Sequence, residues 1–192
     1  MRFVLASASP TRLRVLQDAG FAPEVVVSGV DEDIDIGDDI PGAALLLAQR
    51  KAMAVAKLHP DAVVLGCDSM AWFGGRVLNK PASRDEARSW GRAMRGERVA
   101  VSTGHCIVVG DAIASHVDTA WVRFGEPTDE ELDRYVESGE SDDAAGGFRL
   151  EGRAAAFITG VDGHPGTVHG VSPYVVRHLL HEVGIEVTDL WV

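Results

Sequence analysis

Residues 62–68 read Ala62-Val63-Val64-Leu65-Gly66-Cys67-Asp68, a continuous apolar run that ends in a carboxylate. A short apolar run without alternating polar residues is typical of a strand covered on both faces of its sheet. We therefore predict a strand over 62–67 with helices on both sides. A carboxylate at the end of such a strand lies where α/β sheets bind ligands, so Asp68 is a candidate functional residue.

Strands and helices alternate upstream of this run. Residues 2–6 are predicted to form a buried strand, and 10–19 a helix with Ser9 as its N-cap and proline at its first position. A second strand is predicted at 24–28, followed by a long helix rich in Ala and Leu that starts at Pro41 and reaches about residue 58. This order indicates an α/β fold.

Hairpins dominate the downstream half. Glycine-containing turns at 74–75 and 110–111 separate strand-like segments. The predicted elements are strands at 70–73, 76–78, 98–109, 112–124 and 153–161, helices at 83–94, 128–138 and 173–183, and an exposed loop at 139–147. Thr128 and Glu131 form a capping-box pattern at the start of the second of these helices. Together the elements predict one domain over 1–192, with a mixed central sheet flanked by helices.

The composition excludes several classes of protein. Asp and Glu number 29 against 18 Lys and Arg, giving a net charge of −11, which argues against a nucleic-acid partner. A small anionic substrate needs only a local cluster of cations. No stretch approaches the roughly 20 apolar residues of a membrane helix, so no membrane partner is expected. The two cysteines show no metal-binding spacing, which fits a cytoplasmic location.

The segment from Ser7 to Arg12 is a candidate anion site. It joins a strand to a helix, where free backbone N–H groups and the helix dipole favour an anion. Arg12 lies in the first turn, where a cation opposes the dipole unless an anion lies between them. The alternative is an N-capped surface helix with Arg12 in solvent.

Other polar residues have a functional and a structural interpretation. The acidic loop 31–39 has Ile36 where a calcium loop needs glycine, so calcium binding is excluded and a solvated loop is the alternative. Lys51 and Lys80 are two of only three lysines; each suits a phosphate oxygen or is a surface residue. Asp68 is compatible with a general base, a metal ligand or a cap. The histidines lack metal-binding spacing and receive no role.

In order, these motifs resemble those of the Maf family, also called septum-formation inhibitor proteins, whose members are nucleoside triphosphate pyrophosphatases. The match runs nearly end to end. The shared motifs are Leu5 to Arg12 (Leu-Ala-Ser-x-Ser-Pro-x-Arg), Asp31-Glu32, Leu47 to Ala52 (Leu-Ala-x-x-Lys-Ala), Asp68, Lys80-Pro81, Thr103-Gly104, Tyr135 to Glu140 (Tyr-Val-x-Ser-Gly-Glu) and Ala145 to Phe148 (Ala-Gly-x-Phe).

The resemblance implies a two-lobed α/β fold with a cleft between the lobes, a homodimer, and a divalent cation, Mg²⁺ or Mn²⁺. It implies cleavage between the α- and β-phosphates of a nucleoside triphosphate. It also assigns roles: Asp68 is the proton acceptor, and Glu32 binds the metal together with Asp68. The residues it places around the phosphates are Ser7, Ser9, Arg12, Lys51 and Lys80.

Three departures bear on the choice of substrate. Members that prefer dTTP and UTP often have Arg, Thr and Gln at the positions of Thr11, Ser69 and Glu151. Glu151-Gly152 is more similar to the branch acting on 7-methyl-GTP, and a carboxylate accepts hydrogen bonds from a guanine edge. A late Val-Gly-Leu-Pro motif is replaced by the segment from His169 to Pro173.

Two further functions remain open from the sequence. One is a regulator of cell division that binds a nucleotide without turnover, and the other is a phosphatase that releases orthophosphate. The combination of Glu32, Lys51, Asp68 and Lys80 favours the pyrophosphatase, because a protein that only binds nucleotides has little use for a base beside its cations.

Overall fold

The computed structural model describes residues 1–192. Its strands are β1 (Phe3–Leu5), β2 (Glu24–Val25), β3 (Val63–Phe73), β4 (Arg76–Leu78), β5 (Arg98–Val109), β6 (Ala112–Phe124) and β7 (Ile158–Asp162). Its α-helices are α1 (Pro10–Asp18), α2 (Ile40–Ala56), α3 (Arg84–Ala93), α4 (Asp129–Glu137), α5 (Pro165–Val168) and α6 (Pro173–Glu182). Three short 3₁₀ helices are η1 (Ala145–Gly147), η2 (Arg153–Phe157) and η3 (Val187–Leu190).

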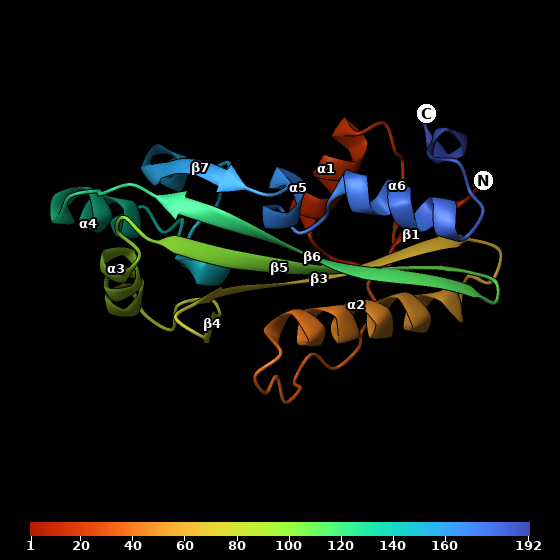
Figure 1. Cartoon of the computed structure of the whole chain (residues 1–192), viewed down its shortest axis with the longest axis horizontal. Coiled ribbons are helices and arrows are strands. Elements are labelled where there is room, and N and C mark those ends of the chain that lie inside the picture. Colours follow the sequence, from red (N-terminus) through yellow and green to blue (C-terminus); the bar gives the residue numbers. More distant parts are fainter.

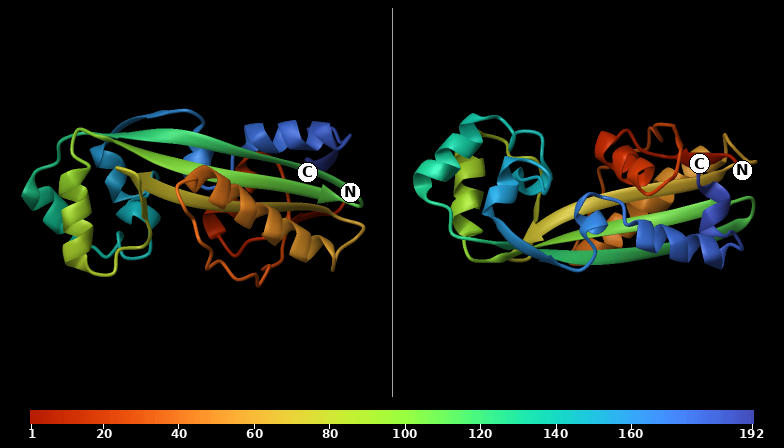
Figure 2. Two further views of the ribbon diagram at one scale, coloured as in Figure 1. Left: turned by 60° about the horizontal axis from the view of Figure 1, so that its bottom comes forward. Right: turned by 90° about the horizontal axis from the view of Figure 1, so that it is seen from above.

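All seven strands belong to one sheet in the order β2-β1-β3-β5-β6-β7, with β4 paired to β3. β1 is parallel to β2 and β3, and the other pairs are antiparallel. α2 covers one face, α1, α5 and α6 lie on the other, and α3 and α4 lie at one end of the long strands (Figure 1). Both termini lie at the opposite end (Figure 2). The mixed sheet flanked by helices is confirmed; the cleft between two lobes stays a prediction.

The prediction that a strand ends at Asp68 is wrong. β3 continues to Phe73 because β5 pairs with it from Val64 to Trp72, and Asp68 lies opposite Gly104. β1, in contrast, pairs with β3 only as far as Leu65. The same edge is taken up again by β4 from Ala71 onwards, so between Leu65 and Ala71 it has no neighbouring strand, and Asp68 lies at this open stretch in the middle of its strand.

Two glycines let α2 lie unusually close to the sheet. A Cβ on Gly66 would lie 2.3 Å from the carbonyl oxygen of Ala48, and one on Gly104 would lie 2.5 Å from that of Ala44. These contacts are to backbone, which cannot move aside. The buried face of α2 repeats at helical spacing and includes Ala44, Leu47, Ala48, Lys51, Ala52 and Val55. The close approach brings Lys51 onto the same face of the sheet as Asp68.

The apolar core has two large clusters. A cluster of 16 residues lies between the sheet and α1 and α6, and includes Leu16, Leu65 and Leu180. A second of 12 residues lies towards α3 and α4, where Phe124 and Phe148 meet edge to face with ring centroids 5.0 Å apart.

Several predicted boundaries need correction. Residues 153–157 form η2, so the strand predicted at 153–161 is β7 over Ile158–Asp162, and the strand predicted at 24–28 covers only Glu24–Val25. The loop at 139–147 is not fully exposed, since Ser141 and Gly147 are buried. α5 and η3 are too short to show a periodic pattern in the sequence. None of the helices combines the length and the hydropathy that a membrane-spanning helix needs.

His105 makes the stability of this fold depend on pH. Its side chain is fully buried, and Nε2 accepts a hydrogen bond from Ser172 N at 2.9 Å, at the start of α6. Burial lowers the pKa of His105 to about 4, with the Arg12 charge acting in the same direction. Because the unfolded chain binds this proton near pH 6.5, the free energy of unfolding is highest above that pH and falls towards pH 4.

We expect this group to remove about 3 kcal/mol of stability between pH 7 and pH 4. His105→Gln keeps an acceptor for Ser172 N and does not titrate. Urea unfolding at both pH values checks this, because the wild type should lose more stability on acidification than the variant. Equal losses would contradict the assignment to His105.

Candidate active site

Lys51 links two carboxylates at the open edge of β3. Its Nζ lies 2.6 Å from Asp68 Oδ1 and 2.7 Å from Glu32 Oε1. The side chains of Lys51 and Asp68 are only 7% and 10% exposed, whereas that of Glu32, in the loop before α2, is 62% exposed. Three residues predicted from separate motifs therefore meet at one ammonium group.

The surroundings make Asp68 more basic than an ordinary aspartate. Burial raises its pKa because it disfavours the charged form, while the hydrogen bond from Lys51 and the charge of Arg12 act in the opposite direction. The net effect is a raised pKa. A carboxylate in this state is held by a cation and accepts a proton more readily than one in water.

The segment from Ser7 to Arg12 forms a closed network. Ser9 is the N-cap of α1 and accepts a hydrogen bond from Arg12 N at 3.3 Å. Ser7 Oγ accepts from Ser9 N at 3.2 Å and from Arg12 Nη1 at 3.1 Å. Arg12 also donates through Nη2 to Ser69 Oγ at 3.0 Å and through Nε to Gly170 O at 2.9 Å. The alternative that Arg12 lies in solvent is therefore wrong.

The segment around α5 is fixed to the sheet. The Thr103 hydroxyl lies 2.7 Å from Thr167 O and 2.9 Å from Ser69 Oγ, and the Thr167 hydroxyl donates to Asp118. Gly170 has φ +89°, and a Cβ there would lie 2.9 Å from Arg12 Nε. Glycine is thus required both by this backbone conformation and by the close approach of the guanidinium.

All ten candidate residues line two adjoining cavities. The first, the Lys51 cavity, has a volume of about 600 Å³; the second, the Glu151 cavity, about 480 Å³. Candidates lining only the Lys51 cavity are Ser7, Glu32, Lys51 and Asp68. Those lining only the Glu151 cavity are Thr11 and Glu151. Four residues line both: Ser9, Arg12, Ser69 and Lys80.

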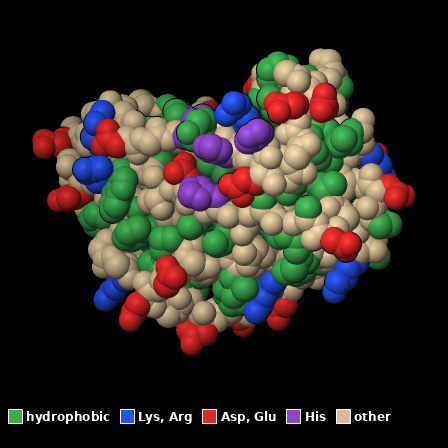
Figure 3. Space-filling model, turned by 45° about the vertical axis from the view of Figure 1, so that its right-hand side comes forward, with side chains coloured by type: hydrophobic (Ala, Val, Ile, Leu, Met, Phe, Trp, Pro, Cys, Tyr) green, Lys and Arg blue, Asp and Glu red, His purple; other side chains and the backbone are tan.

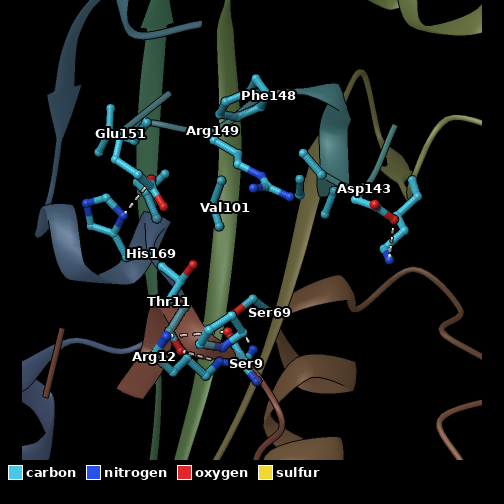
Figure 4. A pocket seen from close by; sticks show the side chains of 18 residues that line it. Ser9, Thr11, Arg12, Ser69, Val101, Asp143, Phe148, Arg149, Glu151 and His169 are labelled. Carbon is cyan, nitrogen blue, oxygen red and sulfur yellow. Dashed lines mark hydrogen bonds and ion pairs between the residues drawn. The ribbon is translucent and has the colours of Figure 1, made fainter. Parts of the chain in front are cut away.

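Polar groups stand at both ends of the Glu151 cavity (Figure 4). Glu151 Oε2 lies 3.1 Å from His169 Nδ1, and Oε1 lies 3.3 Å from Arg14 Nη2. The contact with His169 is the main reason that the pKa of Glu151 falls to about 2. At the other end, Lys80 pairs with Asp143 at 3.2 Å, and both side chains are mostly exposed. Phe148, Val101 and Ala71 supply apolar surface between them.

Sequence reasoning missed two residues of this cavity, His169 and Arg149. Arg149 lies near Phe148 in Figure 4 and forms no ion pair within the chain. The spacing of the histidines predicts no metal site and therefore indicates no role for His169. The available signal for His169 was its place in a segment that departs from the family's Val-Gly-Leu-Pro motif.

The carboxylates fit a divalent cation that is shared with a substrate. No group of three or more His, Cys, Asp and Glu side chains lies close enough to hold a metal by itself. Mg²⁺ is commonly bound by one or two carboxylates together with substrate phosphate oxygens. Asp68 and Glu32 each have one oxygen on Lys51 and a second oxygen free of it, which suits that mode.

The surface of the molecule carries both signs of charge. Acidic and basic side chains are interspersed on the face shown in Figure 3, where several histidines also gather. The cations that line the cavities, Arg12, Lys51, Lys80 and Arg149, are local features of an acidic protein. Such a local concentration of positive charge suits a small anionic ligand.

Comparison with known proteins supports the resemblance to the Maf family over nearly the whole chain. The family model for Maf-like proteins matches residues 2–183. The nucleoside triphosphate pyrophosphatase of Streptomyces avermitilis is 48% identical over 195 residues, which cover 99% of this chain and 94% of that protein. The proteins of the same name from Streptomyces coelicolor and Saccharopolyspora erythraea are 46% and 47% identical, covering 99% and 100% of this chain and 94% and 97% of theirs. This chain belongs to the Maf family.

Proposed function

We propose that this chain hydrolyses a nucleoside triphosphate to a nucleoside monophosphate and pyrophosphate, with Asp68 as the general base. The observation that carries the proposal is the buried Asp68, held by Lys51 on a cavity that Arg12 and Lys80 also line. The relatives that cover almost the whole chain and carry the name nucleoside triphosphate pyrophosphatase support the same activity.

The phosphates would occupy the Lys51 cavity and its border with the Glu151 cavity. Arg12 and Lys80 line both spaces, and Ser7 and Ser9 belong to the turn at the N-terminus of α1, where backbone N–H groups favour an anion. Positive groups held in place before the reaction stabilise the charge that develops on the leaving pyrophosphate.

Asp68 would act on the attacking water. The water oxygen forms a bond to the α-phosphorus, the bond from that phosphorus to the bridging oxygen of the β-phosphate breaks, and Asp68 takes one proton of the water. Its raised pKa favours this transfer, and Lys51 holds the carboxylate in place. A positioned base of this kind adds roughly 10²- to 10⁴-fold to the rate.

A divalent cation, Mg²⁺ or Mn²⁺, would be held by Asp68 and Glu32 together with phosphate oxygens. When bound, it would neutralise part of the triphosphate charge and polarise the phosphoryl oxygens. Lys51 would then keep both carboxylates oriented, because it contacts one oxygen of each.

The nucleobase would enter the Glu151 cavity, where Thr11, Ser69 and Glu151 contribute to specificity. Glu151 is ionised at any ordinary assay pH because its pKa is about 2, so it can only accept hydrogen bonds. Bases that present N–H groups, whether standard or modified, would therefore be favoured over those that present only acceptors.

A panel of standard and modified nucleoside triphosphates, assayed with Mg²⁺ and with Mn²⁺, tests the proposal. Pyrophosphate and orthophosphate are measured separately. Pyrophosphate release without orthophosphate is expected, and turnover should stop when the cation is removed with a chelator. Release of orthophosphate alone would identify a phosphatase instead. The homodimer implied by the family resemblance is checked by sedimentation equilibrium, where a mass of 20.5 kDa would contradict it.

A further inference from the structure

The Glu151 carboxylate is held by a histidine from a distant part of the chain. His169 follows α5 directly, and its Nδ1 lies 3.1 Å from Glu151 Oε2. The two side chains are 20% and 29% exposed, so the pair is mostly shielded from water. Nδ1 itself is buried and forms no well-aligned hydrogen bond, and Glu151 is the one carboxylate within ion-pair distance of it. An exposed ion pair would contribute little to stability. A shielded pair that faces a cavity, in contrast, fixes the direction of the carboxylate.

Hydrogen bonds hold the backbone in place on both sides of His169. Thr167, two residues earlier, is fully buried, receives the Thr103 hydroxyl at its carbonyl and donates to Asp118. Gly170, one residue later, accepts from Arg12 Nε. His169 is therefore anchored on both sides to groups of the sheet and of the Lys51 cavity, and it does not need Glu151 to stay in place.

A carboxylate on a loop needs a fixed neighbouring side chain if it is to recognise a nucleobase by hydrogen bonding. Glu151 lies between η1 and η2, outside every helix and strand, and its other oxygen contacts only Arg14, whose side chain is 56% exposed. Without His169 the carboxylate would be free to turn towards solvent. With it, the carboxylate stays at the wall of the cavity, where Figure 4 shows it against His169.

We propose that His169 is a positioning residue for nucleobase recognition, which holds the Glu151 carboxylate so that it accepts hydrogen bonds from N–H groups of the base. This inference rests on the proposed function and adds a residue to its specificity. Gly170, the residue after His169, accepts a hydrogen bond from Arg12, which lines both cavities.

The test compares turnover of the four ribonucleoside triphosphates with that of ribose 5′-triphosphate, which has no base. The measured quantity is the ratio of kcat/KM for the best nucleotide to kcat/KM for ribose 5′-triphosphate. His169→Ala and His169→Phe both remove the donor, and Phe keeps the volume of the ring. His169→Asn places its amide nitrogen where Nδ1 stands. His178→Ala, an exposed histidine of α6 that lines neither cavity, is the matched control.

We expect the ratio to fall about tenfold or more in the Ala and Phe variants, because the group that holds the Glu151 carboxylate towards the base is lost. Asn should restore most of the ratio, and the His178 variant should keep it. A ratio that is unchanged in both the Ala and Phe variants, with nucleotide turnover intact, overturns the inference and leaves the proposed function standing. A wild-type protein that hydrolyses no triphosphate overturns both.

Discussion

Replacing Asp68 by asparagine is expected to lower kcat by roughly 10²- to 10⁴-fold, the usual contribution of a positioned base. Asparagine has the same shape and still offers an oxygen to Lys51 Nζ, which lies 2.6 Å from Asp68 Oδ1 in the wild type. It cannot take a proton from water. Because Arg12 and Lys80 remain, KM should change far less than kcat. Steady-state release of pyrophosphate measures both parameters.

Asp85→Asn is the matched control for this variant. Asp85 lies on α3 with a side chain that is 95% exposed, and it lines neither cavity. Its replacement should leave kcat as it is. An Asp68→Asn protein that turns over as fast as the wild type would remove Asp68 from the role of base and leave it as a ligand or a structural group.

Replacing Lys51 by methionine is expected to destabilise the fold by about 3–5 kcal/mol, because it leaves the buried Asp68 carboxylate without its cation. Methionine keeps most of the aliphatic chain of Lys51, so the change removes mainly the charge. The pKa of Asp68 should rise further, since the hydrogen bond from Lys51 is the largest influence opposing burial. Urea unfolding at neutral pH measures the loss, and turnover should fall with it.

Two variants separate the charge from the packing. Lys57→Met makes the same exchange at an exposed position just after α2 and should change stability by no more than about 0.5 kcal/mol. The double variant Lys51→Met with Asp68→Asn should be more stable than Lys51→Met alone, because the unpaired buried charge is gone. If the second substitution brought no recovery, the Lys51–Asp68 pair would not be the source of the cost.

Local sequence signals predicted most of the elements but misplaced Asp68 within its strand. The pattern Asp68-Ser69 interrupts an apolar run and predicts the end of a strand, whereas β5 continues the pairing across both residues. The pairing of Asp68 with Gly104, 36 residues further along the chain, is a tertiary property. The turns at 74–75 and 110–111 were predictable, since glycine at positive φ there joins strands that pair directly.

The candidate site was predictable as a set of residue types, but its geometry was not. The closeness of Lys51 to Asp68 depends on Gly66 and Gly104, whose lack of a side chain matters only once α2 packs on the sheet. Likewise the contact of His169 with Glu151 joins two irregular segments, and α5, which positions His169, is only four residues long. Nothing periodic in the sequence marks such a contact.

Hydrolysis in water labelled with heavy oxygen tests the proposed reaction most directly. Purified wild-type protein is incubated with Mg²⁺ and its best nucleoside triphosphate, and the products are analysed by mass spectrometry. Attack at the α-phosphorus predicts one labelled oxygen in the nucleoside monophosphate, equimolar unlabelled pyrophosphate and no orthophosphate. A label in pyrophosphate or orthophosphate, or tight binding of the nucleotide with no release of pyrophosphate, would contradict it.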